Sequence, residues 1–202
     1  MTLQAASNSA RDSDKHARFM ALLEPCLAKL SRYCHAMTKD VEDGRDLLSD
    51  AILLSYENFE KLRVPEAFTS YIFTTARRLF YRRERRKKFW GVFGSEAEMI
   101  ADEREPTPEM RIDLEALDRA LTLLPEKQRE AVILFEISGL SLAEIRDVQG
   151  GSLSGVKSRI VRGREKLAEL LGERQPTQAR TPAPRPTSFE RSQVAYLMRE
   201  KL

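Results

Sequence analysis

A run of basic and aromatic residues between positions 77 and 90 is suited to binding a polyanion. Arg77 to Lys88 contains eight basic residues and one acidic residue, although the net charge of the whole chain is only +3. Cations this close together repel one another unless an anion relieves them. Four aromatic residues that could stack on unpaired bases are interleaved with or follow them: Phe80, Tyr81, Phe89 and Trp90. The stretch favours melted DNA as ligand; the alternative is a solvated helix end whose aromatics, Phe80 especially, pack into their own domain.

A second candidate site lies near residues 141–171. Ser141 to Glu144 forms a capping box, which predicts the start of a short helix. Gln149-Gly150-Gly151 predicts a turn, and Ser152 or Ser154 would cap a longer helix with basic residues in its first turns. Five apolar residues would pack the two helices together: Leu142, Ile145, Val148, Val156 and Ile160. This pattern favours a DNA-binding helix-turn-helix over an ordinary helical hairpin with a solvated basic face.

Three helices are expected to carry the first of these sites. Apolar residues recur with helical spacing in three segments. The first runs from Phe19 to Met37, the second follows Asp40 and ends near Phe59, and the third begins after Pro65 and continues into the basic stretch. Pro25 should kink or split the first helix. Since no segment alternates like a strand, residues 15–90 are predicted to form an all-helical domain, preceded by a flexible N-terminus over 1–14.

The remaining chain predicts a linker, a second domain and a tail. Residues 91–112 are acidic and contain Pro106 and Pro108, as in an exposed, flexible linker. Within 113–172, Pro125 should open one helix and Gly139 should end it. Residues 173–202 are rich in proline, and their end could form a short amphipathic helix that needs a partner. The predicted class is all-α: two small helical domains joined by this linker, the second a helix-turn-helix, plus the tail.

Composition argues against several other functions. No apolar run approaches the length of a membrane span, and the N-terminus lacks the apolar core of a secretory signal, so a cytoplasmic protein is expected. Cys26 and Cys34 lack the spacing of a metal-ligand pair and are expected to be reduced and buried. His16 and His35 stand apart from any cluster of carboxylates or nucleophiles. We therefore expect neither an enzyme nor a metal or cofactor.

Several blocks of the chain together resemble the extracytoplasmic-function (ECF) family of RNA polymerase sigma factors. They appear in the family's order and spacing over roughly residues 19–171, which is more specific than a single helix-turn-helix. The blocks are Asp43 to Ala51, Phe68 to Arg78, Leu124 to Glu130, Val156 to Arg159 and Arg162 to Leu167.

The resemblance implies a division of work among these blocks. A helix would dock on the clamp of core RNA polymerase through Asp46, Leu47, Ser49 and Asp50. The loop from Glu60 to Pro65 and a helix bearing Arg77, Arg78 and Arg82 would open and read the minus-ten promoter element. The minus-thirty-five element would be read by Ser154, Lys157, Ser158, Arg159 and Arg162. Partners would be core polymerase, promoter DNA and an anti-sigma factor or other regulator.

The chain also departs from the family's pattern. Ser49 stands for the usual glutamine, Tyr71 for the tryptophan and Arg78 for an asparagine, while Ser154-Gly155 replaces a Gly-Thr pair. These departures leave the promoter sequence open. Two alternatives stay open as well: a sigma-like decoy that binds an anti-sigma protein without reading DNA, against which the retained basic residues argue, and a stand-alone helix-turn-helix repressor.

Overall fold

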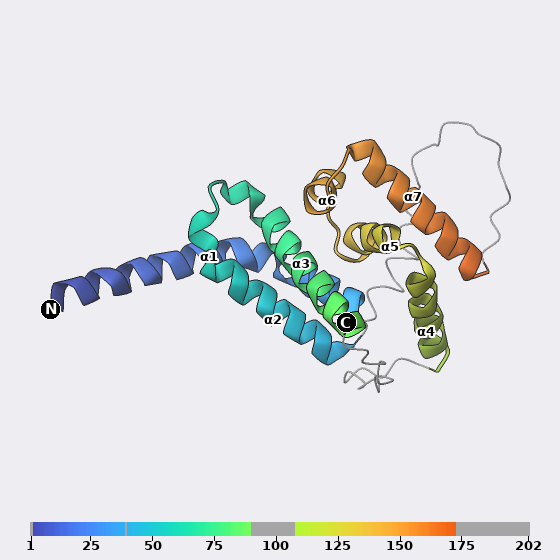
Figure 1. The fold of residues 1–202 in the computed structure, drawn as a ribbon, viewed down its shortest axis with the longest axis horizontal. Coiled ribbons are helices and arrows are strands. Elements are labelled where there is room, and N and C mark those ends of the chain that lie inside the picture. Colours follow the sequence, from blue (N-terminus) through green and yellow to red (C-terminus); the bar gives the residue numbers. More distant parts are fainter. Residues whose placement is uncertain (1, 39, 90–107, 173–202) are drawn as a thin grey trace.

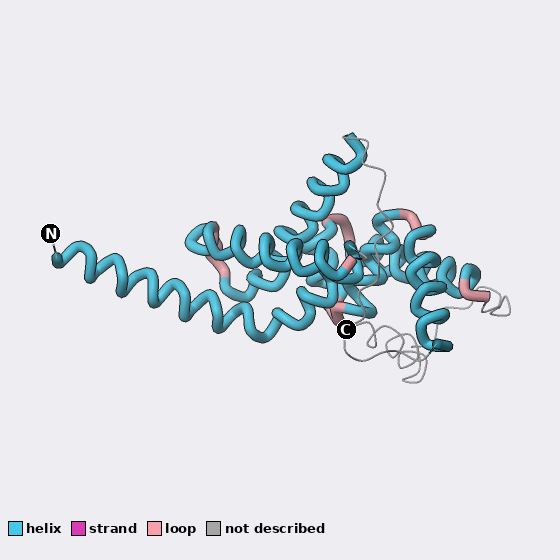
Figure 2. The backbone as a smooth tube through the Cα atoms, turned by 90° about the horizontal axis from the view of Figure 1, so that it is seen from below, coloured by secondary structure: helices cyan, strands magenta, loops and turns pink. Residues whose placement is uncertain are grey.

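The computed structural model describes residues 2–38, 40–89 and 108–172, and helices are the only regular elements in these ranges (Figures 1 and 2). The N-terminal domain contains α1 (Thr2–Thr38), α2 (Val41–Glu57), the short 3-10 helices η1 (Phe59–Lys61) and η2 (Pro65–Ala67), and α3 (Phe68–Phe89). The C-terminal domain contains α4 (Pro108–Leu123), α5 (Glu126–Val132), the π-helical segment η3 (Ile133–Ile137), α6 (Leu142–Gln149) and α7 (Leu153–Leu170). The predicted all-α fold with two helical domains is confirmed.

Helix α1 is longer than the sequence pattern suggests. It begins at Thr2, so residues 2–14, which we expected to be flexible, form its first turns and project away from the other helices (Figures 1 and 2). Once packing has nucleated a helix, adding further turns costs little free energy where the residues are good helix formers, such as Ala5, Ala6 and Ala10. Pro25 lies inside the helix without splitting it. Buried Leu23 and Cys26 on either side of it anchor the two halves in one core.

The three long helices of the N-terminal domain pack around aromatic residues. Phe19 of α1 makes edge-to-face contacts with Phe59 and Phe68, with ring centroids 5.3 and 5.5 Å apart. These two rings lie at the ends of the loop between α2 and α3, so the loop is fixed at both ends. Asp40 caps α2 by accepting a hydrogen bond from the Asp43 amide at 2.8 Å, as its position before the helix predicts.

The turns of the C-terminal domain follow the sequence signals closely. The Ser141 hydroxyl accepts from the Glu144 amide, and the Glu144 carboxylate accepts from the Ser141 amide, which confirms the capping box. Ser152, of the two serines considered, caps α7 by accepting from the Gly155 amide at 3.1 Å. Gly139 has a φ of 65°, in the left-handed region, and ends the helix that Pro125 opens.

The two domains also pack against each other, which the sequence pattern does not predict. Helix α1 lies against η3 and α3 lies against α6. Buried apolar residues of both domains form one continuous cluster, which includes Tyr33 and Phe73 on one side and Ile133 and Ile145 on the other. The predicted linker as far as residue 107 lies outside the described residues, and so does the predicted tail from residue 173 with the short helix expected at its end. Residues 108–112 were also predicted to belong to the linker, but they form the start of α4.

Close packing at Gly163 makes a prediction about stability. A Cβ atom at this position would lie 2.6 Å from Val132 Cγ2 and 3.3 Å from the Gln128 carbonyl oxygen. We expect Gly163→Ala to lower the free energy of unfolding by about 1–3 kcal/mol, because α7 must move away from α5 despite alanine's better helix propensity. Chemical denaturation would measure it. Val161→Ala, at a half-exposed position of the same helix, is the control and should change stability by less than about 0.5 kcal/mol. A Gly163→Ala protein as stable as the control would contradict this packing.

Candidate nucleic-acid and polymerase interfaces

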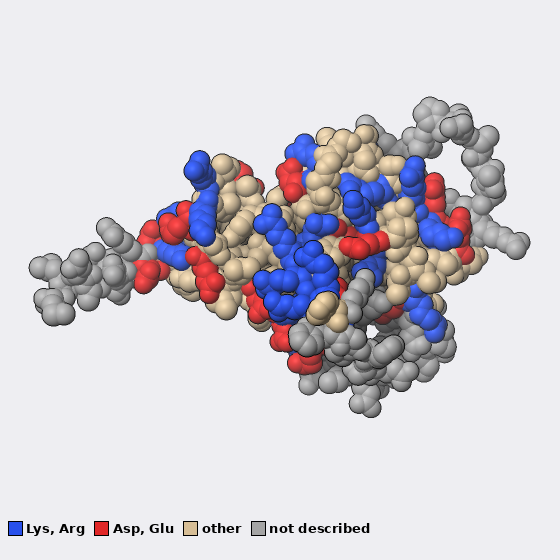
Figure 3. All heavy atoms as spheres, in the orientation of Figure 1, with Lys and Arg blue, Asp and Glu red and all other residues tan. Residues whose placement is uncertain are grey.

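The basic residues of α3 point in different directions, and only some of them face solvent. Arg78, Arg82 and Arg85 are exposed and spaced four and three residues apart, so they form one stripe, which we call the α3 arginine stripe. Figure 3 shows Lys and Arg side chains gathered over the second half of α3. Arg83 and Lys87 point to α2 instead, where they bond Asp50 at 2.6 Å and Asp43 at 2.7 Å. Only part of the basic run therefore faces outward. Arg85 extends the predicted set, and its spacing from Arg78 and Arg82 is the signal that could have found it.

Arg77, predicted to read DNA beside Arg78 and Arg82, points in another direction. Its Nε donates to both carboxylate oxygens of Glu130, at 2.8 and 3.0 Å, and its guanidinium lies 4.9 Å from the Tyr81 ring centroid. Burial lowers the pKa of Arg77, but the charge and hydrogen bonds of Glu130 outweigh it and leave the pKa above its usual value. Arg77 is therefore charged and bound to the other domain.

The aromatic residues of the basic run do not form one stacking surface. Phe80 is 4% exposed and belongs to the core, so the packing alternative applies to it. Tyr81 is partly buried, and its pKa is raised, first by burial and then by the nearby carboxylate of Glu130. Phe89 is 85% exposed at the end of α3, and Trp90 lies outside the described residues.

The first half of α7 presents the side chains predicted to read DNA. Ser154, Lys157, Ser158 and Arg162 are exposed, while Val156, Ile160 and Gly163 are buried against the rest of the domain. Arg159 is half-buried, and its Nη2 donates to the Gly150 carbonyl oxygen at 3.0 Å.

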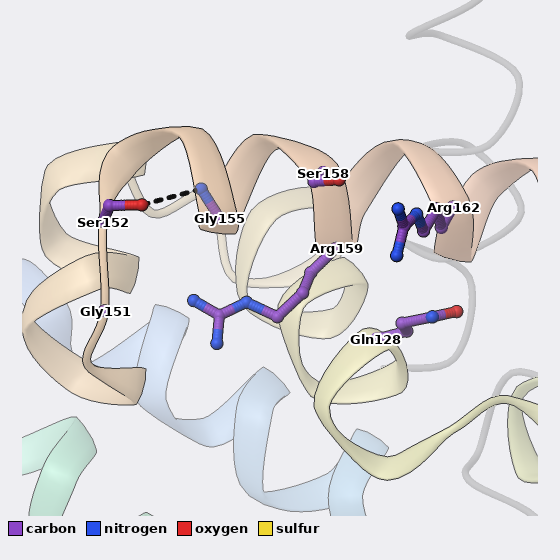
Figure 4. Close-up of a pocket in the computed structure, with 7 residues that line it drawn as sticks. All are labelled: Gln128, Gly151, Ser152, Gly155, Ser158, Arg159 and Arg162. Carbon is purple, nitrogen blue, oxygen red and sulfur yellow. Dashed lines mark hydrogen bonds between the residues drawn. The ribbon is translucent and has the colours of Figure 1, made fainter.

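A shallow hollow of about 350 Å³ lies along this half of α7. Its lining combines α7 with the preceding turn and α5: Gln128, Gly151, Ser152, Gly155, Ser158, Arg159 and Arg162. In Figure 4 the Arg159 side chain extends towards Gly151, and Arg162 lies across the hollow from Gln128. Gln128 was not among the predicted residues, because the helix-turn-helix pattern begins after it in the chain.

The exposed face of α2 carries most of the residues expected to bind polymerase. Asp46, Ser49 and Asp50 are exposed, and the two carboxylates lie one helical turn apart. Leu47 is the exception: it is fully buried in the core and cannot contact another protein through its side chain. The exposed hydrophobic residue of this face is Leu53, which is 58% exposed and three residues after Asp50. Residues 46, 50 and 53 are spaced four and three apart, so Leu53 lies on the same face of α2 as the two carboxylates, whereas Leu47 does not.

The loop between α2 and α3 completes the N-terminal surface. Glu60, Arg63 and Pro65 are exposed, and so is Val64, at 53%. Since Phe59 and Phe68 hold both ends of the loop in the core, its tip is presented in a fixed place beside the start of α3.

No helix within the described ranges has both the length and the hydrophobicity to cross a membrane.

Comparison with known proteins identifies both domains. Residues 22–89 match the family described as Sigma-70 region 2, and residues 114–167 match Sigma-70 region 4. The chain is 31% identical over 144 residues to the ECF RNA polymerase sigma factor SigM of Mycobacterium tuberculosis, covering 71% of this chain and 72% of that protein. It is 28% identical over 144 residues to the ECF sigma factor EcfG of Rhodopseudomonas palustris, covering 70% and 78%.

A solved structure shows the same arrangement of helices. The sigma factor RpoE of Bartonella quintana, crystallised in complex with the anti-sigma factor NepR, matches with a TM-score of 0.64 and 26% identity. The match covers 76% of this chain and 96% of that one.

Proposed function

Because this chain belongs to the ECF RNA polymerase sigma factors, we propose that it binds core polymerase through α2 and reads promoter DNA through α3 and α7. As a sigma factor it is a transcription initiation factor and not an enzyme, and it acts with core RNA polymerase on promoter DNA. The assignment of this work to particular residues is the proposal.

One observation carries the assignment for the minus-thirty-five element: α7 buries Val156 and Ile160 and exposes Lys157, Ser158 and Arg162. A helix held from behind in this way can enter a major groove with its polar side chains facing base edges and phosphates. Ser154 at the start of the helix and half-buried Arg159 at the hollow complete the set. Gln128 joins it from α5.

The α3 arginine stripe and the loop over Glu60 to Pro65 are proposed to open and read the minus-ten element. The stripe supplies three exposed cations for phosphates, and the loop exposes Val64, an apolar residue of a kind that can lie against an unstacked base. Both are fixed by the same packed core. Arg77 joins this surface only when it leaves Glu130.

Polymerase docking is proposed to use the α2 face of Asp46, Ser49, Asp50 and Leu53. Two carboxylates beside an exposed leucine offer a basic partner surface both charge and an apolar contact. Leu47 supports this face from behind, in the core.

Because transcription takes place in the cytoplasm of bacteria, we propose that the protein works there. We also propose an anti-sigma partner, as its structural relative RpoE has.

Transcription with purified core polymerase tests the proposal. Adding this chain should give transcripts with defined start sites from a subset of genomic promoters, and core polymerase alone should give none. A sigma-like decoy would bind an anti-sigma protein yet direct no initiation. A stand-alone repressor would bind duplex DNA without polymerase. Absence of transcripts despite stable binding to core polymerase would contradict promoter reading by this chain.

The α3 arginine stripe makes a prediction of its own. Arg82→Gln combined with Arg85→Gln should reduce promoter opening at least about tenfold, because two phosphate contacts are lost, and the salt dependence of promoter binding should become shallower by about two ion equivalents. Filter binding over a series of salt concentrations and permanganate footprinting would measure the two effects. Arg119→Gln, an exposed arginine of α4, is the matched control. An unchanged salt slope in the double variant would place the minus-ten contacts elsewhere.

A further inference from the structure

A cavity of about 620 Å³ lies between the second half of α3 and the helices α4 and α5. This volume falls within the range of small-molecule sites, which is roughly 300–1,000 Å³. Six of the residues that line it bear on what it could bind: Arg78, Tyr81, Glu84 and Arg85 of α3, and Glu126 and Arg129 of α5. The cavity is large enough for an organic ligand, and the charges in its wall indicate which kind.

Three arginines in this wall carry positive charge that no carboxylate neutralises directly. Arg78 and Arg85 are exposed and Arg129 is half-buried, and none of the three forms an ion pair with another described residue. Arg77, which also lines the cavity, is by contrast paired with Glu130 at 2.8 Å. Unpaired arginines around one cavity repel one another, and an anion between them relieves that repulsion. Their planar guanidinium groups match phosphate oxygens in particular.

Two hydrogen-bond donors in the same wall lack acceptors. Arg129 Nε and the Tyr81 hydroxyl are buried, and neither has a hydrogen-bond partner within the part of the chain that the structure describes. Burial first, and then the charges of Glu130 and Glu126, raise the pKa of Tyr81, so its hydroxyl stays protonated and can donate. A buried donor without an acceptor costs about 1–3 kcal/mol. Since both residues line the cavity, a small rotation of each side chain towards a ligand oxygen would supply the missing acceptor.

Glu84 and Glu126 restrict the kind of anion that fits. Both line the cavity, and neither is paired with a cation among the described residues. They would repel inorganic phosphate or sulfate, which would also fill only a small part of the volume. A ligand with phosphates at one end and N–H or O–H donors at the other satisfies the arginines and the glutamates together. Nucleotides have this composition, and the apolar part of the wall, formed by Phe80 and Leu124, suits their rings.

We propose that this cavity binds a nucleoside di- or triphosphate. Arg78, Arg85 and Arg129 hold the phosphates, while Glu84 and Glu126 accept hydrogen bonds from the base or the ribose. The site lies beyond the proposed function and does not depend on it, because binding is expected of the protein alone, without polymerase or DNA.

Equilibrium dialysis of the full chain against ADP, ATP and GTP tests the site. Each nucleotide should bind saturably to one site, whereas adenosine, which has no phosphate, should not. Arg85→Gln and Arg129→Gln should each weaken nucleotide binding at least about tenfold, because each removes a charge-assisted hydrogen bond to phosphate. Arg86→Gln is the matched control: Arg86 is exposed on α3 next to Arg85 but does not line the cavity, and its loss should change the affinity less than about twofold.

Pyrophosphate separates recognition of a nucleotide from attraction of any anion. Glu84→Gln combined with Glu126→Gln removes the two negative charges, so this variant should bind pyrophosphate more tightly and nucleotides less tightly than the wild type. We expect the ratio of nucleotide affinity to pyrophosphate affinity to fall at least about tenfold. Circular dichroism checks that each protein is folded. Arg85 is exposed, so Arg85→Gln keeps the test decisive even if Arg129→Gln disturbs the fold.

Two outcomes would overturn the proposal. If none of the nucleotides binds saturably, or if Arg86→Gln weakens binding as much as Arg85→Gln does, the cavity is not the binding site. If the wild-type protein binds pyrophosphate as tightly as the nucleotides, the site recognises phosphate alone and the assignment to nucleotides is wrong. Neither outcome bears on transcription with core polymerase, so failure of this site and failure of the proposed function remain distinguishable.

Discussion

A protein carrying Asp46→Lys and Asp50→Lys is expected to lose binding to core polymerase. The two carboxylates are exposed one turn apart on α2, so reversal puts two positive charges against a partner surface that should itself be basic. Like-charge contacts of this kind cost several kcal/mol in an interface, and the affinity should fall at least about a hundredfold. Co-purification with core polymerase and a fluorescence titration of the complex would measure it.

The ion pair at Asp50 has to be considered in reading this result. Arg83 donates to Asp50 at 2.6 Å, so a lysine at position 50 would face an arginine of α3. Asp46→Lys alone keeps that ion pair and should still weaken binding at least about tenfold. Asp12→Lys with Asp14→Lys, on the projecting part of α1, is the matched control for charge. A doubly reversed protein that is folded and still co-purifies with core polymerase would show that the docking face lies elsewhere.

Local signals in the sequence predicted the helices and their ends well. Asp40, Ser141 and Gly139 have short-range roles, in which a side chain or a backbone angle acts within a few residues. Such roles depend little on the rest of the fold. The length of α1 was missed, because its extension through residues 2–14 depends on the packed helix that follows.

Contacts between distant residues explain why Leu47 and Arg77 lie elsewhere than their positions along the helices suggest. Leu47 lies between exposed Asp46 and polar Ser49, but the direction of its side chain places it in the core. Arg77 and Arg78 look equivalent in the sequence, yet one bonds a glutamate 53 positions away and the other is exposed. No helical pattern within α3 contains that information, because the position of Glu130 is set by the packing of one domain on the other.

Removing Arg159 should weaken recognition of the minus-thirty-five element. Arg159 lines the hollow along α7, next to Ser158 and about one helical turn before Arg162, in the half of the helix proposed to enter the groove. An arginine that bonds a base there contributes about 1–3 kcal/mol of discrimination. Arg159→Ala should therefore lower promoter affinity about tenfold or more. It should also reduce the difference in affinity between the preferred minus-thirty-five element and elements in which a base has been substituted.

The bond from Arg159 to Gly150 sharpens the experiment. Arg159 Nη2 donates a hydrogen bond to the Gly150 carbonyl oxygen in the turn between α6 and α7, so the alanine variant also loses a contact that orders the turn. Loss of turn order would weaken binding to all sequences equally, whereas loss of a base contact relaxes the preference at one position. Binding of the holoenzyme should therefore be measured on promoters with each base at every minus-thirty-five position, at fixed salt. Arg146→Ala, an arginine of α6 paired with Asp147, is the matched control. Wild-type affinity and an unchanged base preference in Arg159→Ala would remove Arg159 from the reading surface and leave Arg162, Lys157 and Gln128 to carry it.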